Sequence, residues 1–98
     1  MVRRKDFKEE VYQLAKEIGV NVTEIHMRKM RNKWASCSSR GRLTFDPAIL
    51  RMQDRKRYEI VLHELLHLRY PNHGKMFKTM LNTYLEKALN RKDKREDA

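Results

Sequence analysis

The chain has 98 residues, of which 40% are hydrophobic and 37% are charged, and its formal net charge is +10. This length suits one small domain. A single cysteine excludes an intrachain disulfide, and no apolar run approaches the length of a membrane span. Because the first ten residues also lack the apolar core of a secretory signal, we expect a cytoplasmic, reducing location.

Apolar residues recur at helical spacing between residues 6 and 18, which predicts an amphipathic helix. Asp6 is its expected N-cap and Gly19 its expected C-terminal stop. Residues 20–30 then alternate in character and contain several β-branched side chains, a pattern typical of a strand. We expect His26 on this strand to be exposed or paired across it, and a role in binding metal is the less favoured alternative.

Residues 34–45 predict a β-hairpin whose turn is Ser39-Arg40-Gly41, where glycine permits a positive φ. Trp34 is the only tryptophan, and it is expected to lie in the core rather than on an exposed rim. Cys37 has no second cysteine as a partner, so a small buried thiol is favoured over a metal ligand. Asp46 and Pro47 predict the start of a short helical turn.

Two further helices are expected in the second half of the chain. Asp54 is the predicted N-cap of a helix over residues 55–69, which Pro71 ends because proline cannot continue the hydrogen-bond ladder. Apolar residues at helical spacing predict another helix over residues 76–89. We expect residues 1–90 to form one domain and the charged residues 91–98 to form a flexible tail.

The helix over residues 55–69 contains the pattern His63-Glu64-x-x-His67. Residues four apart lie on one helix face, so both imidazoles can point at a single ion. Glu64 is displaced around the helix and can reach a water beside that ion without binding the ion itself. This pattern indicates two zinc ligands and a general base on one helical turn.

A catalytic zinc usually has three protein ligands, and His73 is the expected third. It follows the chain reversal that Pro71 imposes, so it can approach the ion from outside the helix. Three of the four histidines in the chain thus lie in one eleven-residue segment, from His63 to His73. The alternative is a set of buried polar groups that protein partners alone satisfy. We favour one Zn²⁺ per chain, because a single ion would satisfy the histidines together.

Four segments of the sequence are found together in one family: Arg31-x-x-Trp34-Ala-Ser-Cys-Ser-Ser39, Leu43-Thr-Phe45, Val61-Leu-His-Glu-Leu-Leu-His-Leu68 and Pro71-Asn-His-Gly-x-x-Phe77. On these motifs the chain resembles the YgjP-like zinc metallopeptidases, which are related to the SprT-like proteases and the minigluzincins. The resemblance implies a zincin-like α+β fold. In such a fold a small mixed or antiparallel sheet packs on the central helix, its rim strand lies beside the substrate cleft, and N- and C-terminal helices flank it.

The resemblance also implies that His63, His67 and His73 bind zinc and that Glu64 is the catalytic base. The expected function is therefore a zinc-dependent metallopeptidase acting on a peptide or protein substrate. The excess of lysine and arginine supports an alternative, a nucleic-acid-binding or DNA-associated module with the same zinc site and conditional or absent protease activity. A metal-bound scaffold without catalysis is a third hypothesis, which the glutamate at the base position disfavours. No membrane partner is expected.

Overall fold

The computed structural model describes residues 1–97 of the chain, with side chains through Lys92. Helix α1 (Arg4–Ile18) buries the apolar stripe that the sequence predicted, and Gly19 ends it with a φ of 84°. The expected N-cap was wrong, because the helix begins two residues earlier and Arg3 occupies that position. Asp6 lies instead in the first turn, where a negative charge also favours the helix dipole.

The sheet has three short strands in the order β1-β3-β2. Strand β1 (Glu24–Met27) is parallel to β3 (Arg42–Phe45), and β2 (Ala35–Cys37) is antiparallel to β3. The hairpin prediction is confirmed, whereas the strand expected over residues 20–30 is limited to four residues. Gly41 ends the hairpin turn with a φ of 88°, and a Cβ there would lie 2.5 Å from the Asn21 carbonyl oxygen. Only glycine fits at this position.

The placement of Trp34 in the core was wrong, because its side chain is 48% exposed. It precedes β2, an edge strand of the sheet, and its backbone carbonyl accepts a hydrogen bond from the Asp46 N–H. The interior beside this strand holds Phe45 instead, which packs edge-to-face on Phe7 with ring centroids 5.0 Å apart. Trp34 is therefore left on the surface next to α2.

The 3₁₀ helix η1 (Pro47–Arg51) connects the sheet to helix α2 (Asp54–His67). Asp46 caps η1 as predicted, since its side chain accepts a hydrogen bond from the Ala48 N–H. The N-cap of α2 is Gln53 rather than Asp54, which lies in the first turn. Helix α2 is the central element, because it packs against α1, α3 and β2. It ends at His67, two residues before the predicted end.

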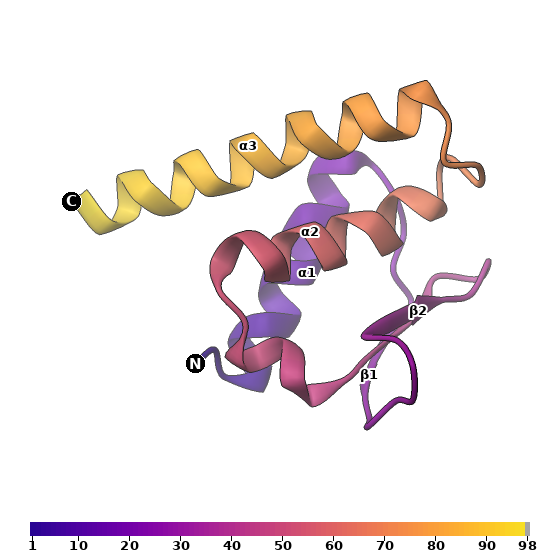
Figure 1. Cartoon of the computed structure of the whole chain (residues 1–98), viewed down its shortest axis with the longest axis horizontal. Coiled ribbons are helices and arrows are strands. Elements are labelled where there is room, and N and C mark those ends of the chain that lie inside the picture. Colours follow the sequence, from indigo (N-terminus) through magenta and orange to yellow (C-terminus); the bar gives the residue numbers. More distant parts are fainter. Residues whose placement is uncertain (98) are drawn as a thin grey trace.

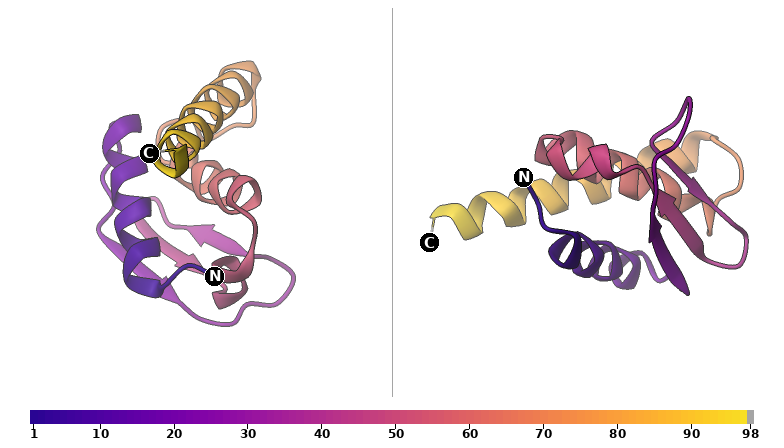
Figure 2. Two further views of the ribbon diagram at one scale, coloured as in Figure 1. Left: turned by 90° about the vertical axis from the view of Figure 1, so that its left-hand side faces the viewer. Right: turned by 90° about the horizontal axis from the view of Figure 1, so that it is seen from below.

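Helix α3 (Lys75–Asp97) lies along α2, with α1 behind them (Figure 1). The sheet is at the end of the molecule away from both termini (Figure 2). The sequence placed the end of α3 near residue 89, which was too early, since the helix includes most of the charged tail. Ala98, the last residue of that tail, lies outside the described residues, and the flexibility of the tail stays a prediction. The mixed sheet, central helix and flanking helices confirm the expected α+β architecture.

Within residues 1–97, no helix combines the length and apolar character that crossing a membrane requires.

Candidate metal centre

Three histidines converge at the C-terminal end of α2. His63 and His67 lie one turn apart on the helix, and the chain reversal after it brings His73 back to them. One nitrogen from each ring lies within 4.8 Å of a nitrogen of the other two. The Nε2 atoms of His67 and His73 are 2.8 Å apart, close enough for one to donate a hydrogen bond to the other. The structure thus brings all three predicted ligands to one point.

The donor set fits a zinc ion. Two nitrogens on one tetrahedral zinc, each at about 2.0–2.1 Å, lie about 3.3 Å apart. The separation of 2.8 Å between His67 and His73 needs only a small outward rotation of either ring to reach that value. Three imidazoles without a protein thiolate or carboxylate also form one of the ligand sets that catalytic zinc uses.

Burial is the main cause that lowers the pKa of His67 below its ordinary value, and the neighbouring His63 lowers it further. A lower pKa favours the neutral imidazole, the form whose lone pair binds metal. His67 therefore holds a free lone pair over a wider pH range than an exposed histidine does.

Glu64 lies beside the histidines without joining their cluster. Its Oε2 accepts a hydrogen bond from His63 Nδ1 at 3.0 Å, and its side chain is 14% exposed. With Nδ1 engaged in this way, Nε2 of His63 is the nitrogen free to bind an ion. The glutamate is partly shielded from solvent yet remains in reach of whatever the histidines hold.

Phe77 supports all three imidazoles, a role that the sequence analysis did not assign to it. Its ring centroid lies 5.3, 5.0 and 4.8 Å from those of His63, His67 and His73, and the side chain is 2% exposed. The spacing that signals this role is His73-x-x-x-Phe77, which places the ring in the first turn of α3. The packing restricts how far the imidazoles can tilt.

Arg69, which sequence reasoning also passed over, fixes the start of the reversal that carries His73. Its Nη1 donates a hydrogen bond of 2.8 Å to the Ile18 carbonyl at the end of α1. The guanidinium thus satisfies a carbonyl that a helix terminus leaves without an intrahelical partner. The loop between α2 and α3 is thereby attached to α1.

Cys37 and His26 do not join the histidine cluster. Cys37 on β2 is half-buried, and burial, with a smaller contribution from the Glu64 carboxylate, raises its pKa to about 11. His26 is exposed on β1 and lies 3.2 Å from the Glu24 carboxylate. That neither binds metal stays a prediction. Tyr70 is half-buried against the core.

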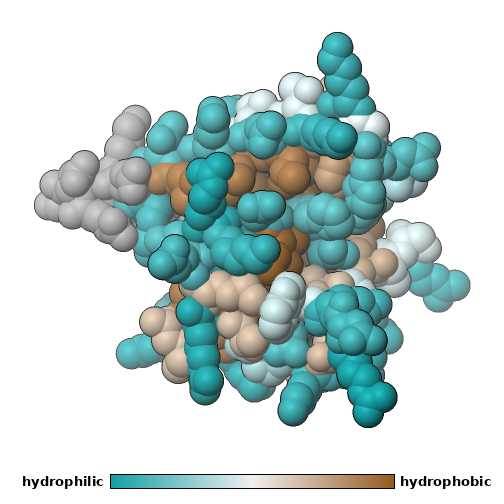
Figure 3. All heavy atoms as spheres, in the orientation of Figure 1, coloured by the Kyte–Doolittle hydropathy of each residue, from teal (hydrophilic) through white to brown (hydrophobic). Residues whose placement is uncertain are grey.

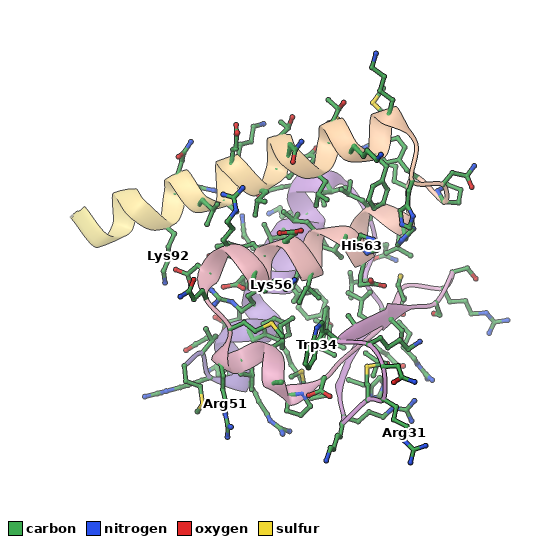
Figure 4. The ribbon with its side chains drawn as sticks, viewed as in Figure 1. Arg31, Trp34, Arg51, Lys56, His63 and Lys92 are labelled. Carbon is green, nitrogen blue, oxygen red and sulfur yellow. The ribbon has the colours of Figure 1, made fainter. Side chains whose placement is uncertain are left out.

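A cavity of about 270 Å³ opens beside the cluster, between α2 and the segment leading into β2. Ile60, His63 and Glu64 line it from α2, and Trp34 is among the residues that line it from the other side. Trp34 and His63 lie on the same face of the molecule (Figure 4). In the same orientation, hydrophobic atoms are visible in a hollow near the centre of this face (Figure 3).

The family model described as YgjP-like, metallopeptidase domain matches residues 2–96. The chain belongs to the YgjP-like metallopeptidase family. This assignment confirms the resemblance that the motifs around Trp34, His63 and His73 indicated. A search of curated protein sequences finds no significant match for this YgjP-like chain.

A solved structure with the same fold is the metallopeptidase zymogen of Pyrococcus abyssi abylysin. The two chains are 19% identical, with a TM-score of 0.68, and the alignment covers 91% of this YgjP-like chain and 93% of abylysin. Identity at this level shows a shared fold. Family and fold together support a metallopeptidase function, with a metal that the three histidines can bind.

Proposed function

We propose that the protein is a zinc-dependent metallopeptidase in which His63, His67 and His73 hold one Zn²⁺ and Glu64 is the general base. The observation that carries this proposal is the convergence of three imidazoles from a helix and the following loop, with a carboxylate beside them. The substrate is a peptide or protein, as the family assignment supports.

When bound, zinc supplies Lewis acidity, which makes water more acidic and polarises the carbonyl of the scissile bond. The chain's own contribution begins with Glu64, whose carboxylate takes a proton from the attacking water. The same carboxyl group then delivers that proton to the nitrogen of the leaving amine. Its partial burial weakens competition from bulk water for this proton.

The three histidines have different supports, which together fix their orientation. His63 donates from Nδ1 to Glu64, and all three rings rest on Phe77. His73 depends on the loop that Arg69 attaches to α1. Such outer contacts hold metal ligands in a productive arrangement before the ion arrives.

The proposal is tested by metal content and by hydrolysis, measured on the same preparations. We expect one zinc per chain in the wild type and in Glu64→Gln, and none retained by His73→Ala after dialysis. Hydrolysis of a casein or fluorogenic peptide mixture should fall by about 10²–10⁴-fold in Glu64→Gln, the range that general bases contribute. His26→Ala is the matched control, because this exposed histidine lies outside the cluster.

Two results would contradict the proposal. A wild-type protein without stoichiometric zinc would remove the metal centre. A fully zinc-loaded protein whose function does not change in Glu64→Gln would indicate a scaffold without catalysis.

A second candidate function is nucleic-acid binding, which one feature of the surface favours. The segment 28–34 carries four cations, all exposed: Arg28, Lys29, Arg31 and Lys33. None of them forms an ion pair with another described side chain. Trp34 follows them with a half-exposed ring on which a base can stack.

This second function predicts binding to single-stranded DNA or RNA that weakens steeply as salt increases, because phosphate contacts release counterions. Fluorescence anisotropy with a labelled oligonucleotide between 50 and 200 mM salt measures that slope. Binding that is absent at the lowest salt concentration removes the candidate.

A further inference from the structure

The cavity beside Glu64 has an apolar lining that the proposed hydrolysis does not itself explain. Trp34, Ala35 and Ile60 line it, and Trp34 leaves 48% of its side chain exposed there. An exposed tryptophan at the edge of a hollow is a common feature of recognition surfaces, because the ring provides a large, rigid contact area. The volume of about 270 Å³ lies just below the range of small-molecule sites and suits a single side chain.

The cavity adjoins the candidate metal centre, since His63 belongs to both and Glu64, beside the histidines, lines the cavity. Its occupant must therefore lie in contact with the carboxylate that acts as the base. A peptide bond placed for attack at the histidines brings the side chain of an adjacent residue to this position. The cavity is thus placed to select the residue next to the cleaved bond rather than a distant anchor.

The charges around the cavity indicate which side chains it accepts. An acidic side chain would be repelled by Glu64 in the wall and by Glu59 at the rim. A basic side chain would pair with Glu64, occupy the base and meet Lys33 at the opening. An apolar side chain avoids both conflicts and covers the exposed part of Trp34.

We propose that this cavity is the specificity pocket for a large apolar side chain adjacent to the scissile bond, and that Trp34 determines that specificity. The inference rests on the proposed peptidase function, because it assumes that a peptide lies across the histidines. It extends that function by naming the substrate class: peptides with leucine, methionine or phenylalanine next to the cleaved bond.

Trp34 is also the reporter for the test, because no other tryptophan contributes to the emission. The zinc-loaded Glu64→Gln protein is titrated with blocked peptides Ala-Ala-X-Ala-Ala, where X is leucine, alanine, arginine or aspartate. We expect a blue shift with the leucine peptide and a Kd at least about tenfold lower than with the alanine peptide, since three more apolar carbons are buried. The aspartate peptide should bind no better than the alanine peptide, since Glu59 remains in this variant, and the arginine peptide gains no pairing with residue 64 and still meets Lys33.

Two variants locate the effect on β2. Ala35→Leu, combined with Glu64→Gln, should fill the cavity and remove the preference for leucine. Ser36→Leu is the matched control, because neighbouring strand residues face opposite sides of the sheet. If Ala35→Leu fails to fold, Trp34→Ala replaces it with calorimetry as the readout, since an exposed side chain contributes little to the core.

Equal affinity for all four peptides, or emission that no peptide changes, overturns the pocket. Cleavage by the wild type that ignores the residue beside the bond overturns it too, while leaving the metallopeptidase proposal intact. Conversely, leucine-selective binding without cleavage by the wild-type zinc form supports the pocket and refutes the hydrolytic function.

Discussion

At the scale of single residues, the reactivity of the Cys37 thiol depends on its burial and on the nearby Glu64 carboxylate. Burial and the nearby carboxylate raise the pKa of its thiol to about 11, so at pH 8 about 0.1% is thiolate, against about a quarter for an ordinary cysteine. Because the thiolate is the nucleophile, we expect iodoacetamide to react about a hundredfold more slowly with the metal-free protein than with its guanidinium-unfolded form. Mass spectrometry at timed intervals measures both rates.

The same measurement separates the two causes of this shift. Glu64→Gln removes the negative charge that disfavours the thiolate, so the reaction should become faster in the folded variant. Burial remains, so the rate should not reach that of the unfolded chain. A folded wild-type protein that reacts at the unfolded rate would contradict the environment assigned to Cys37.

Asp46 gives a prediction that depends on pH. Its carboxylate accepts hydrogen bonds from the Met30 and Ala48 N–H groups, each of 2.9 Å, and these bonds lower its pKa below the ordinary value near 3.9. A depressed folded pKa contributes stability that is present above the unfolded pKa and lost as the pH falls through the folded one.

We therefore expect Asp46→Asn to be less stable than the wild type at pH 7, with the difference shrinking below about pH 4. The amide keeps one acceptor oxygen and cannot serve both donors. Urea unfolding at a series of pH values measures the difference. A gap between the two proteins that stays constant from pH 7 to pH 3 would show that the charge of Asp46 plays no part.

At the scale of elements, a buried ion pair joins α1 to α2. Arg57 has 1% of its side chain exposed and donates to both carboxylate oxygens of Glu10, at 2.8 and 3.2 Å, and to Asp54 at 2.8 Å. Removing one partner leaves a buried charge incompletely compensated, which is costly. We expect Glu10→Gln to lower the free energy of unfolding by about 3 kcal/mol.

Glu9→Gln is the control for this prediction, because its side chain is exposed on the same helix. It should change stability by less than about 0.5 kcal/mol, as surface substitutions usually do. Chemical denaturation of the two variants gives the comparison. Equal losses would mean that Asp54 alone satisfies Arg57.

The attachment of the loop that carries His73 to α1 gives a second prediction at this scale. Arg69→Ala removes the hydrogen bond to the Ile18 carbonyl, which is worth about 1 kcal/mol of stability. Because His73 follows in the same loop, zinc affinity should also fall several-fold, as it does when outer contacts of metal ligands are lost.

Competition with a chromogenic chelator measures that affinity, and Arg55→Ala is the control, because this residue of the first turn of α2 is exposed. Unchanged zinc affinity in Arg69→Ala would limit the residue to a structural role. Arg69→Lys should recover part of the affinity, because an ammonium can still donate to the carbonyl.

At the scale of the whole molecule, helix geometry explains what the sequence could predict. The spacing of His63 and His67 defines one face of a helix whatever surrounds it, and Pro71 requires the reversal that returns His73. The apolar stripe of α1 has the same local origin. These features depend on residues that are close in sequence, so they can be predicted before any tertiary contact is known.

Other features depend on partners distant in sequence. Trp34 precedes a strand of three residues, which is too short for alternation to show which way the ring faces. The sequence could not predict the parallel pairing of β1 with β3 either. Side chains alternate between the two faces of a strand in the same way whether its neighbour runs parallel or antiparallel. Asp6 and Asp54 were assigned as caps although they lie in first turns, since acidic residues stabilise both positions.

The local origin of the histidine cluster also bears on how the chain would acquire the proposed zinc ion. All three rings lie within eleven residues, so closing the loop between them costs little entropy even before the fold exists. We therefore expect the unfolded chain to keep measurable affinity for the proposed zinc ion, which reduces the stabilisation that binding gives the native state. Chelation should shift the melting temperature less than the native affinity alone implies. On this proposal, we expect a nascent chain to bind the ion during synthesis, before α3 has left the ribosome.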